Sequence, residues 1–110
     1  NHIPVKLNED KFDTPFGIIP IPVSLKGKKF NESGFLVHRP WDVKISADGD
    51  FEIEIINSYF FGDYQEVRFK PINSEYDEQF KFFTHIGEYF APGSKLRISI
   101  PAERLTFCSN

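Results

Sequence analysis

The sequence has few of the residues that covalent chemistry needs. It contains no methionine and a single cysteine, Cys108, so no disulfide can form within the chain. This absence favours a reducing compartment over an oxidising one. Cys108 follows Phe107 in an expected strand, and no basic residue is evident that would activate its thiol. We therefore expect Cys108 to be a small hydrophobic residue of the core.

Short motifs of catalysis are also missing. None of GxxxxGK[ST], GxGxxG, GxSxG or HExxH occurs. The histidines His2, His38 and His85 are scattered and have no second ligand at metal-binding spacing, so we expect surface or partly buried side chains. The carboxylates between positions 48 and 54 lack the spacing of an EF-hand loop. We predict no catalytic, cofactor-binding or metal-binding residue in this chain, and no enzyme activity.

The chain has neither a basic surplus nor a long apolar run. Its net charge is −3, with both signs interspersed. The basic footprint of a nucleic-acid-binding protein is therefore absent, and we expect no such partner. Apolar runs such as Ile18–Val23 are far too short to span a bilayer, and no signal segment opens the chain. These features predict a soluble, intracellular protein.

Aromatic residues are abundant: 13 Phe, 4 Tyr and 1 Trp. They favour sheet, and apolar residues alternate with polar ones along much of the chain. Residues Phe51, Ile53 and Ile55 are one such series. We predict an all-β fold, a small OB-like barrel of about eight short strands forming a single domain over residues 1–110. The expected strands include Lys11–Thr14, Ile18–Ile21, Val43–Ser46, Phe51–Ile56, Tyr64–Lys70, Phe80–Thr84 and the alternating Leu96, Ile98 and Ile100.

Turn residues fall between these strands. A tight turn is expected at Thr14-Pro15-Phe16-Gly17, and others at Asp48-Gly49, Phe61-Gly62-Asp63 and Ala91-Pro92-Gly93. Because Pro20 and Pro22 cannot donate hydrogen bonds, Ile18–Val23 is predicted to be an edge strand or a strap over the barrel. The polar stretch Asn73–Gln79 is predicted to be a loop.

Two groups of aromatic residues suggest a contact surface. Residues Tyr59, Phe60, Phe61 and Tyr64 surround an expected turn. The pair Phe82-Phe83 places one ring on each face of its strand, so one ring points away from the core. Either a neighbouring loop or subunit covers that ring, or it forms part of a ligand platform.

Two stretches resemble the TOBE domain, the regulatory domain that follows the ATPase domain in ABC importers. Residues Gly34 to Ile45 (GFLVHRPWDVKI) are similar to that family's strand, Arg-Pro-Glu-Asp turn and following strand, with Trp41 where the family usually has Glu or His. Residues Pro92 to Leu105 (PGSKLRISIPAERL) are similar to its closing Pro-Gly-Asp, strand, Pro-Glu-Arg segment, with Ser94 replacing Asp and Ala102 inserted. Residues 51–69 and 12–20 resemble the family's central and entering hairpins.

The resemblance implies an OB-like barrel in the cytoplasm, held at the membrane through a transporter. ATP and magnesium would bind only in an ATPase domain upstream of Asn1. Partners would be a second ATPase subunit in a homodimer, the membrane permease subunits and, in some members, a small solute or a regulatory protein. The matching residues are structural-corner, ligand or interface candidates: Arg39, Pro40, Trp41, Asp42, Gly62, Gly93, Glu103 and Arg104.

Two alternatives to the importer domain remain. One is a free-standing β-barrel or sandwich that binds a partner protein, as an adaptor or immunity protein does, with contacts through exposed aromatic side chains. The other is a carbohydrate-binding module that stacks sugars on Trp41, Tyr59 or Tyr64.

Overall fold

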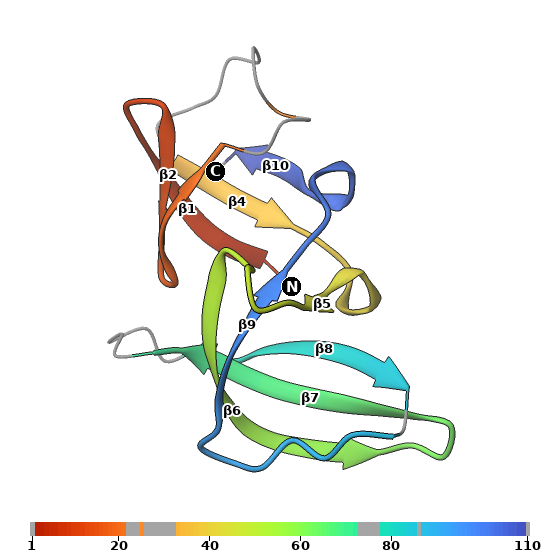
Figure 1. Ribbon diagram of the computed structural model, residues 1–110. Helices are drawn as coiled ribbons and strands as arrows, with labels where there is room; N and C mark the ends of the chain where they lie inside the picture. Colours follow the sequence, from red (N-terminus) through yellow and green to blue (C-terminus); the bar gives the residue numbers. More distant parts are fainter. Residues whose placement is uncertain (1, 22–24, 26–32, 73–77, 86, 110) are drawn as a thin grey trace.

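The computed structural model describes residues 2–21, 25, 33–72, 78–85 and 87–109, and within them the chain is all-β, as predicted (Figure 1). Ten strands form two antiparallel five-stranded sheets. In chain order, the elements are β1 (His2–Asn8), β2 (Lys11–Thr14), β3 (Gly17–Pro20), β4 (Ser33–Val37), the 3-10 helix η2 (Pro40–Asp42), β5 (Lys44–Ile45), β6 (Phe51–Phe60), β7 (Tyr64–Pro71), β8 (Phe80–His85), β9 (Lys95–Ser99), the 3-10 helix η3 (Ala102–Arg104) and β10 (Thr106–Ser109).

Sheet A has the strand order β10-β4-β1-β2-β3 and occupies the upper part of Figure 1. Strand β4 lies between β1 and β10, the first and the last strands of the described residues. Pro4 faces Phe35 of β4 in the register, whereas β2 pairs with β1 only from Lys6 onward. Pro4 therefore lies where β1 has no strand on its β2 side within the described residues, a position that tolerates a missing N–H.

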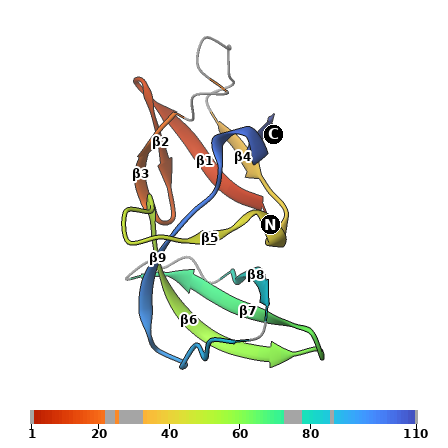
Figure 2. The same ribbon diagram turned by 45° about the vertical axis from the view of Figure 1, so that its right-hand side comes forward.

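Sheet B has the order β5-β9-β6-β7-β8 and curls into a half-barrel, consistent with the predicted OB-like barrel. Its longest pairing is the hairpin of β6 and β7, whose register shifts between Ile55 and Asn57. This bulge bends β6, since an extra residue on one strand increases its local twist. Figure 2, turned by 45°, shows sheets A and B above one another, with β9 leading from sheet B toward sheet A.

Apolar side chains from both sheets form one core. The alternation read from the sequence is confirmed in β6, where Phe51, Ile53 and Ile55 are buried and Glu52 is exposed. The most deeply buried residues of the core include Phe12, Leu36, Ile53, Ile55, Val67, Phe69, Phe82 and Ile98.

Three local predictions need correction. The described residues contain ten strands, compared with the predicted number of about eight, and β1 is one strand that was not foreseen. The predicted strand Val43–Ser46 is reduced to Lys44–Ile45, and Val43 is the extended residue that follows η2. The prediction for Cys108 is wrong: β10 turns Phe107 toward the core and leaves Cys108 exposed.

Other predictions concern residues only partly described. The prediction that Ile18–Val23 is an edge strand is confirmed for Ile18 to Pro20, which belong to β3 at the edge of sheet A. Ile21 lies outside the strand, and Pro22 and Val23 lie outside the described residues. In the predicted loop 73–79, only Glu78 and Gln79 are described, and both lie outside any strand. Among the described residues, no helix is both long enough and apolar enough to cross a bilayer.

Candidate functional site

The corner after β4 is built by the segment Arg39–Asp42. Arg39 is extended (φ −90°, ψ 150°) and Pro40 begins η2, as expected for a residue before proline and for proline in a first helical turn. The Arg39 N–H donates to Oδ2 of Asp42 at 3.2 Å, and the Asp42 N–H donates to the Arg39 carbonyl at 3.0 Å. The two backbone groups thus fix a single tight turn.

Asp42 joins the two stretches that carry the family resemblance. Its side chain is only 11% exposed and lies 3.6 Å from Nε of Arg39 and 3.9 Å from Nε of Arg104 in η3. The predicted residues Arg39, Pro40, Asp42 and Arg104 therefore share one corner. Glu103, also in η3, is exposed. Because the arginine side chains of these ion pairs are more than half exposed, each pair contributes at most about 1 kcal/mol to stability.

The two predicted glycines lie elsewhere. Gly62 occupies the turn between β6 and β7 with φ +87°, and Gly93 the turn before β9 with φ +86°. Both values favour glycine, because a side chain is strained at such angles. Their role is thus to allow turns.

His38, beside the corner, is 4% exposed. Its Nδ1 lies 3.1 Å from the Arg39 carbonyl, to which it donates as a neutral imidazole. Burial lowers the pKa of His38 to about 4, and the hydrogen bond to Arg39 opposes this shift only in part. His38 is therefore a neutral, structural histidine at pH 7.

Five rings gather beside this corner, on the outer face of sheet B: Trp41, Phe61, Tyr64, Phe83 and His85, here named the aromatic surface. Trp41 is central, with ring centroids 5.4 Å from Phe83, 5.4 Å from His85 and 5.6 Å from Tyr64. The ring of Phe61 stacks on Tyr64 at 5.4 Å. Trp41 remains 45% exposed and Phe61 52% exposed, so the surface is open to solvent.

The alternation of β8 produces this arrangement. Phe82 is buried in the core, whereas Phe83 faces outward and packs against Trp41. The prediction of one ring on each face is confirmed, and a neighbouring loop, η2, covers the outer ring. The alternation in the sequence predicts that Phe83 faces away from the core. The packing of Trp41 on Phe83 becomes visible only in the folded structure.

The rim of the aromatic surface is charged. The Lys81 ammonium lies 5.7 Å from the Phe83 ring centroid, and the Arg68 guanidinium lies 5.2 Å from that of Tyr59. Both cations also pair with Glu66, at 3.8 Å and 2.9 Å. Tyr59 thus belongs to the rim. The rings of Trp41 and Tyr64 are inclined by 54°, unlike the coplanar rings of a flat sugar platform.

A cavity of about 220 Å³ adjoins the aromatic surface. It lies between β8 and the segment of η2 and β5, and Trp41 of this segment packs against Phe83 of β8. Its lining comprises Trp41, Val43, Lys44 and Ile45 on one side and Phe82, Phe83, Thr84 and His85 on the other. Ile45 is 47% exposed, so the cavity opens to solvent beside an apolar side chain.

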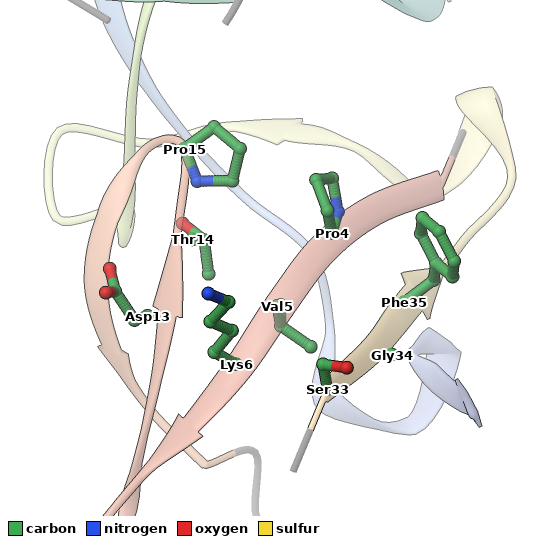
Figure 3. A pocket seen from close by; sticks show the side chains of 9 residues that line it. All are labelled: Pro4, Val5, Lys6, Asp13, Thr14, Pro15, Ser33, Gly34 and Phe35. Atoms are coloured by element: carbon green, nitrogen blue, oxygen red, sulfur yellow. The ribbon is translucent and has the colours of Figure 1, made fainter. Parts of the chain in front are cut away.

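A second cavity, of about 490 Å³, lies on sheet A where β2 diverges from β1 (Figure 3). Lys6 and Asp13 face each other in the register of the two strands. In Figure 3 the Lys6 side chain lies between the strands, on the side of Thr14. The cavity is shallow and lined mainly by the outward face of sheet A, and its polar groups do not converge on a common point.

In the described part of the chain, no cluster of three His, Cys, Asp or Glu side chains could hold a metal ion. Comparison with known proteins adds no family assignment: no protein-family model matches the chain, and no curated protein matches it.

Proposed function

We propose that this domain is a non-catalytic protein-binding module whose contact area is the aromatic surface. The observation that carries this proposal is the exposure of Trp41 and Phe61 within a continuous cluster of rings. Exposed apolar patches on soluble domains commonly mark interaction sites, and Trp and Tyr contribute most strongly to protein interfaces.

The surroundings of the cluster support the same function. A protein interface usually has an apolar centre and a polar rim. Here Arg68, Lys81 and Glu66 form such a rim around Tyr64 and Phe83. The ion pairs within the rim hold its side chains in place, which reduces the entropy lost when a partner binds.

The test is a comparison of partner binding between variants. A partner captured from cells of the source organism would be purified and its affinity measured by calorimetry. Truncating a central Trp typically costs 2 kcal/mol or more, so Trp41→Ala should weaken binding by about 30-fold or more. Ile18→Ala is the matched control, because Ile18 is 61% exposed on an edge strand of sheet A. Equal affinities of the two variants would overturn the proposal.

The regulatory domain of an ABC importer is the more specific form of this proposal. It is favoured by one observation: Asp42 lies in the first stretch that resembles the TOBE domain and pairs with Arg104 in the second. As such a domain, it would act in the cytoplasm beside the membrane, contact a second ATPase subunit and the permease subunits, and in some cases bind a small solute.

The importer proposal is tested by the mass of the protein in its own cells. An antibody raised against this domain should detect a band large enough to include an ATPase domain. A band at the mass of this chain, 12.8 kDa, would refute the importer proposal and leave the general binding proposal standing.

A further inference from the structure

The hairpin of β6 and β7 ends in a run of aromatic residues. Residues 59–64 (YFFGDY), which contain the turn, are here named the hairpin end. Phe60 is 57% exposed and Phe61 52% exposed. In Figure 1 the hairpin end lies at the lower right, away from sheet A, and Figure 2 shows the same. The hairpin end therefore extends into solvent with large apolar side chains.

Both faces of the hairpin end carry aromatic rings. The register places Tyr59 opposite Glu66 and Phe60 opposite Gln65. Glu66 pairs in turn with Phe83 of the aromatic surface, whereas Gln65 is fully buried. Because side chains alternate along a strand, Tyr59 and Phe60 point to opposite faces of the hairpin. The ring of Phe60 consequently lies on the face opposite the aromatic surface.

A second exposed ring belongs to the face of Phe60. The segment that follows β8 lies across this face, because Nε2 of Gln65 donates to the Glu88 carbonyl at 2.7 Å. Phe90 is buried, so the segment is anchored on both sides of Tyr89. Tyr89 itself is 71% exposed. The aromatic surface and the rings of Phe60 and Tyr89 thus occupy opposite faces of one hairpin.

The charge near the hairpin end is negative. Asp63 in the turn and Glu88 beside the hairpin are exposed, and neither forms an ion pair with another described residue. Residues 59–64 contain no lysine or arginine. The cations of the rim, Arg68 and Lys81, already pair with Glu66. Membranes with anionic lipids attract Lys and Arg and repel carboxylates, so the hairpin end favours a protein partner over a lipid surface.

The distribution of the rings also limits the shape of the partner. A flat protein surface covers only one face of the hairpin and leaves the rings of the other face in water. A cleft covers both faces, and the stabilisation rises with the apolar area that is buried. The two carboxylates then lie at the border of the cleft, where basic side chains complement them.

We propose that the hairpin end inserts into an apolar cleft of the partner protein, and that Lys or Arg side chains border this cleft. This inference rests on the proposed binding function and specifies the partner. One wall of the cleft contacts the aromatic surface, and the other contacts Phe60 and Tyr89. The basic border faces Asp63 and Glu88.

The first experiment is photo-cross-linking in cells of the source organism. The amino acid p-benzoylphenylalanine would replace Phe60, Phe61 or Ile18 in three separate variants, and mass spectrometry would identify the attached peptides after illumination. The positions of Phe60 and Phe61 should both attach to the same partner protein, at peptides that border one cleft. Ile18, which is exposed on sheet A, is the control and should not attach to that protein.

The second experiment measures affinity for the protein identified in this way. By calorimetry, Phe60→Ala and Tyr89→Ala should each weaken binding about 10-fold or more, as expected for rings buried at the centre of an interface. Both rings are more than half exposed in the free domain, so the variants should fold, and thermal unfolding checks this. Ile18→Ala should bind like the wild type.

The basic border is tested through the association rate. The double variant Asp63→Asn and Glu88→Gln should associate about 10-fold more slowly at low salt, and the difference should vanish at high salt. Asp50→Asn is the matched control, because Asp50 is exposed at the opposite end of β6. Equal association rates of the double variant and this control would refute the basic border.

Four cross-linking results would overturn the insertion: attachment from Phe61 alone, attachment to lipid, attachment to a second copy of this chain, or no attachment at either position. Wild-type affinity of both Phe60→Ala and Tyr89→Ala would also overturn it. The binding function is judged by Trp41→Ala. If only Trp41→Ala weakens binding, the module stands and the insertion fails, whereas wild-type affinity of all three variants refutes both proposals.

Discussion

The ring of Phe16 lies with its centroid 5.2 Å from that of Phe80, and this contact connects the two sheets. Phe16 belongs to the turn between β2 and β3 of sheet A, whereas Phe80 begins β8 of sheet B. The Thr14 hydroxyl fixes the turn: it donates to the Gly17 carbonyl at 2.8 Å and accepts from the Phe16 N–H at 3.0 Å. A surface turn thereby places one ring inside the core of the other sheet.

Phe16→Ala should therefore destabilise the whole domain. The ring also contacts Phe51 and Phe69, at 5.5 Å and 6.1 Å. Its removal leaves a cavity between the sheets and should lower the free energy of unfolding by about 3 kcal/mol. Urea unfolding followed by circular dichroism measures this value. Phe61→Ala is the control, since Phe61 is 52% exposed; equal losses in both variants would contradict this account.

Gly49→Ala should be more disruptive than substitution of a glycine in an open turn. A Cβ at Gly49 would lie 2.2 Å from the carbonyl oxygen of Ile98, a backbone atom of β9. Relieving this overlap requires a strand to shift, at a cost of about 1–3 kcal/mol or more. Gly62→Ala meets no atom within 4 Å and suffers only from its φ of +87°, a cost of about 1 kcal/mol. Thermal unfolding of both variants shows which substitution lowers the stability more. A larger loss in Gly62→Ala than in Gly49→Ala would refute this explanation.

His38 should make stability depend on pH. The pKa of His38 is about 4 in the folded protein and 6.5 in the unfolded chain, because burial disfavours the charged ring. Between these values only the unfolded chain binds the proton. The free energy of unfolding should thus be fully retained above pH 6.5 and decrease toward pH 4, by up to about 3 kcal/mol from this residue.

Urea unfolding at several pH values between 7 and 4 measures the effect. In His38→Gln the side chain cannot titrate, so the corresponding part of the slope should disappear. If the variant and the wild type lose stability in parallel over this range, His38 is not the responsible group.

Asp42→Ala should destabilise the corner through the lost backbone contact more than through the lost charge. The side chain of Asp42 accepts the Arg39 N–H and is 11% exposed. Its removal should cost about 1–2 kcal/mol, as for a helix cap. Glu52→Ala breaks an ion pair with Arg97 that is about half exposed and should cost well under 1 kcal/mol. Chemical denaturation of both variants tests the difference, and similar values would show that the cap contributes little.

The sequence predicts strands well where side chains alternate without interruption. Phe51, Ile53 and Ile55 identified β6, and the pair Phe82-Phe83 indicated two differently exposed faces. Strand β1 was missed because Pro4 interrupts a short series that contains only Ile3, Val5 and Leu7. Proline is acceptable there only because β2 diverges, which is a property of the sheet and not of the local sequence.

The candidate site was predictable in part. Arg39, Pro40 and Asp42 stand together in the sequence, and their corner could be expected from proline geometry. The meeting of Asp42 with Arg104, and of Trp41 with Phe83 and His85, depends on how distant segments fold together. No local pattern encodes these contacts.

The pairing of β4 with both β1 and β10 has a consequence for biosynthesis. Sheet A joins β1 to β10, the last strand of the described residues, so β4 has no neighbour on its outer side until Thr106–Ser109 has been synthesised. Such long-range pairing slows folding, because distant segments must meet before their contacts stabilise one another. During translation, the nascent domain therefore carries an open sheet edge that chaperones or neighbouring chains can engage, and its folding is completed only after β10 has left the ribosome.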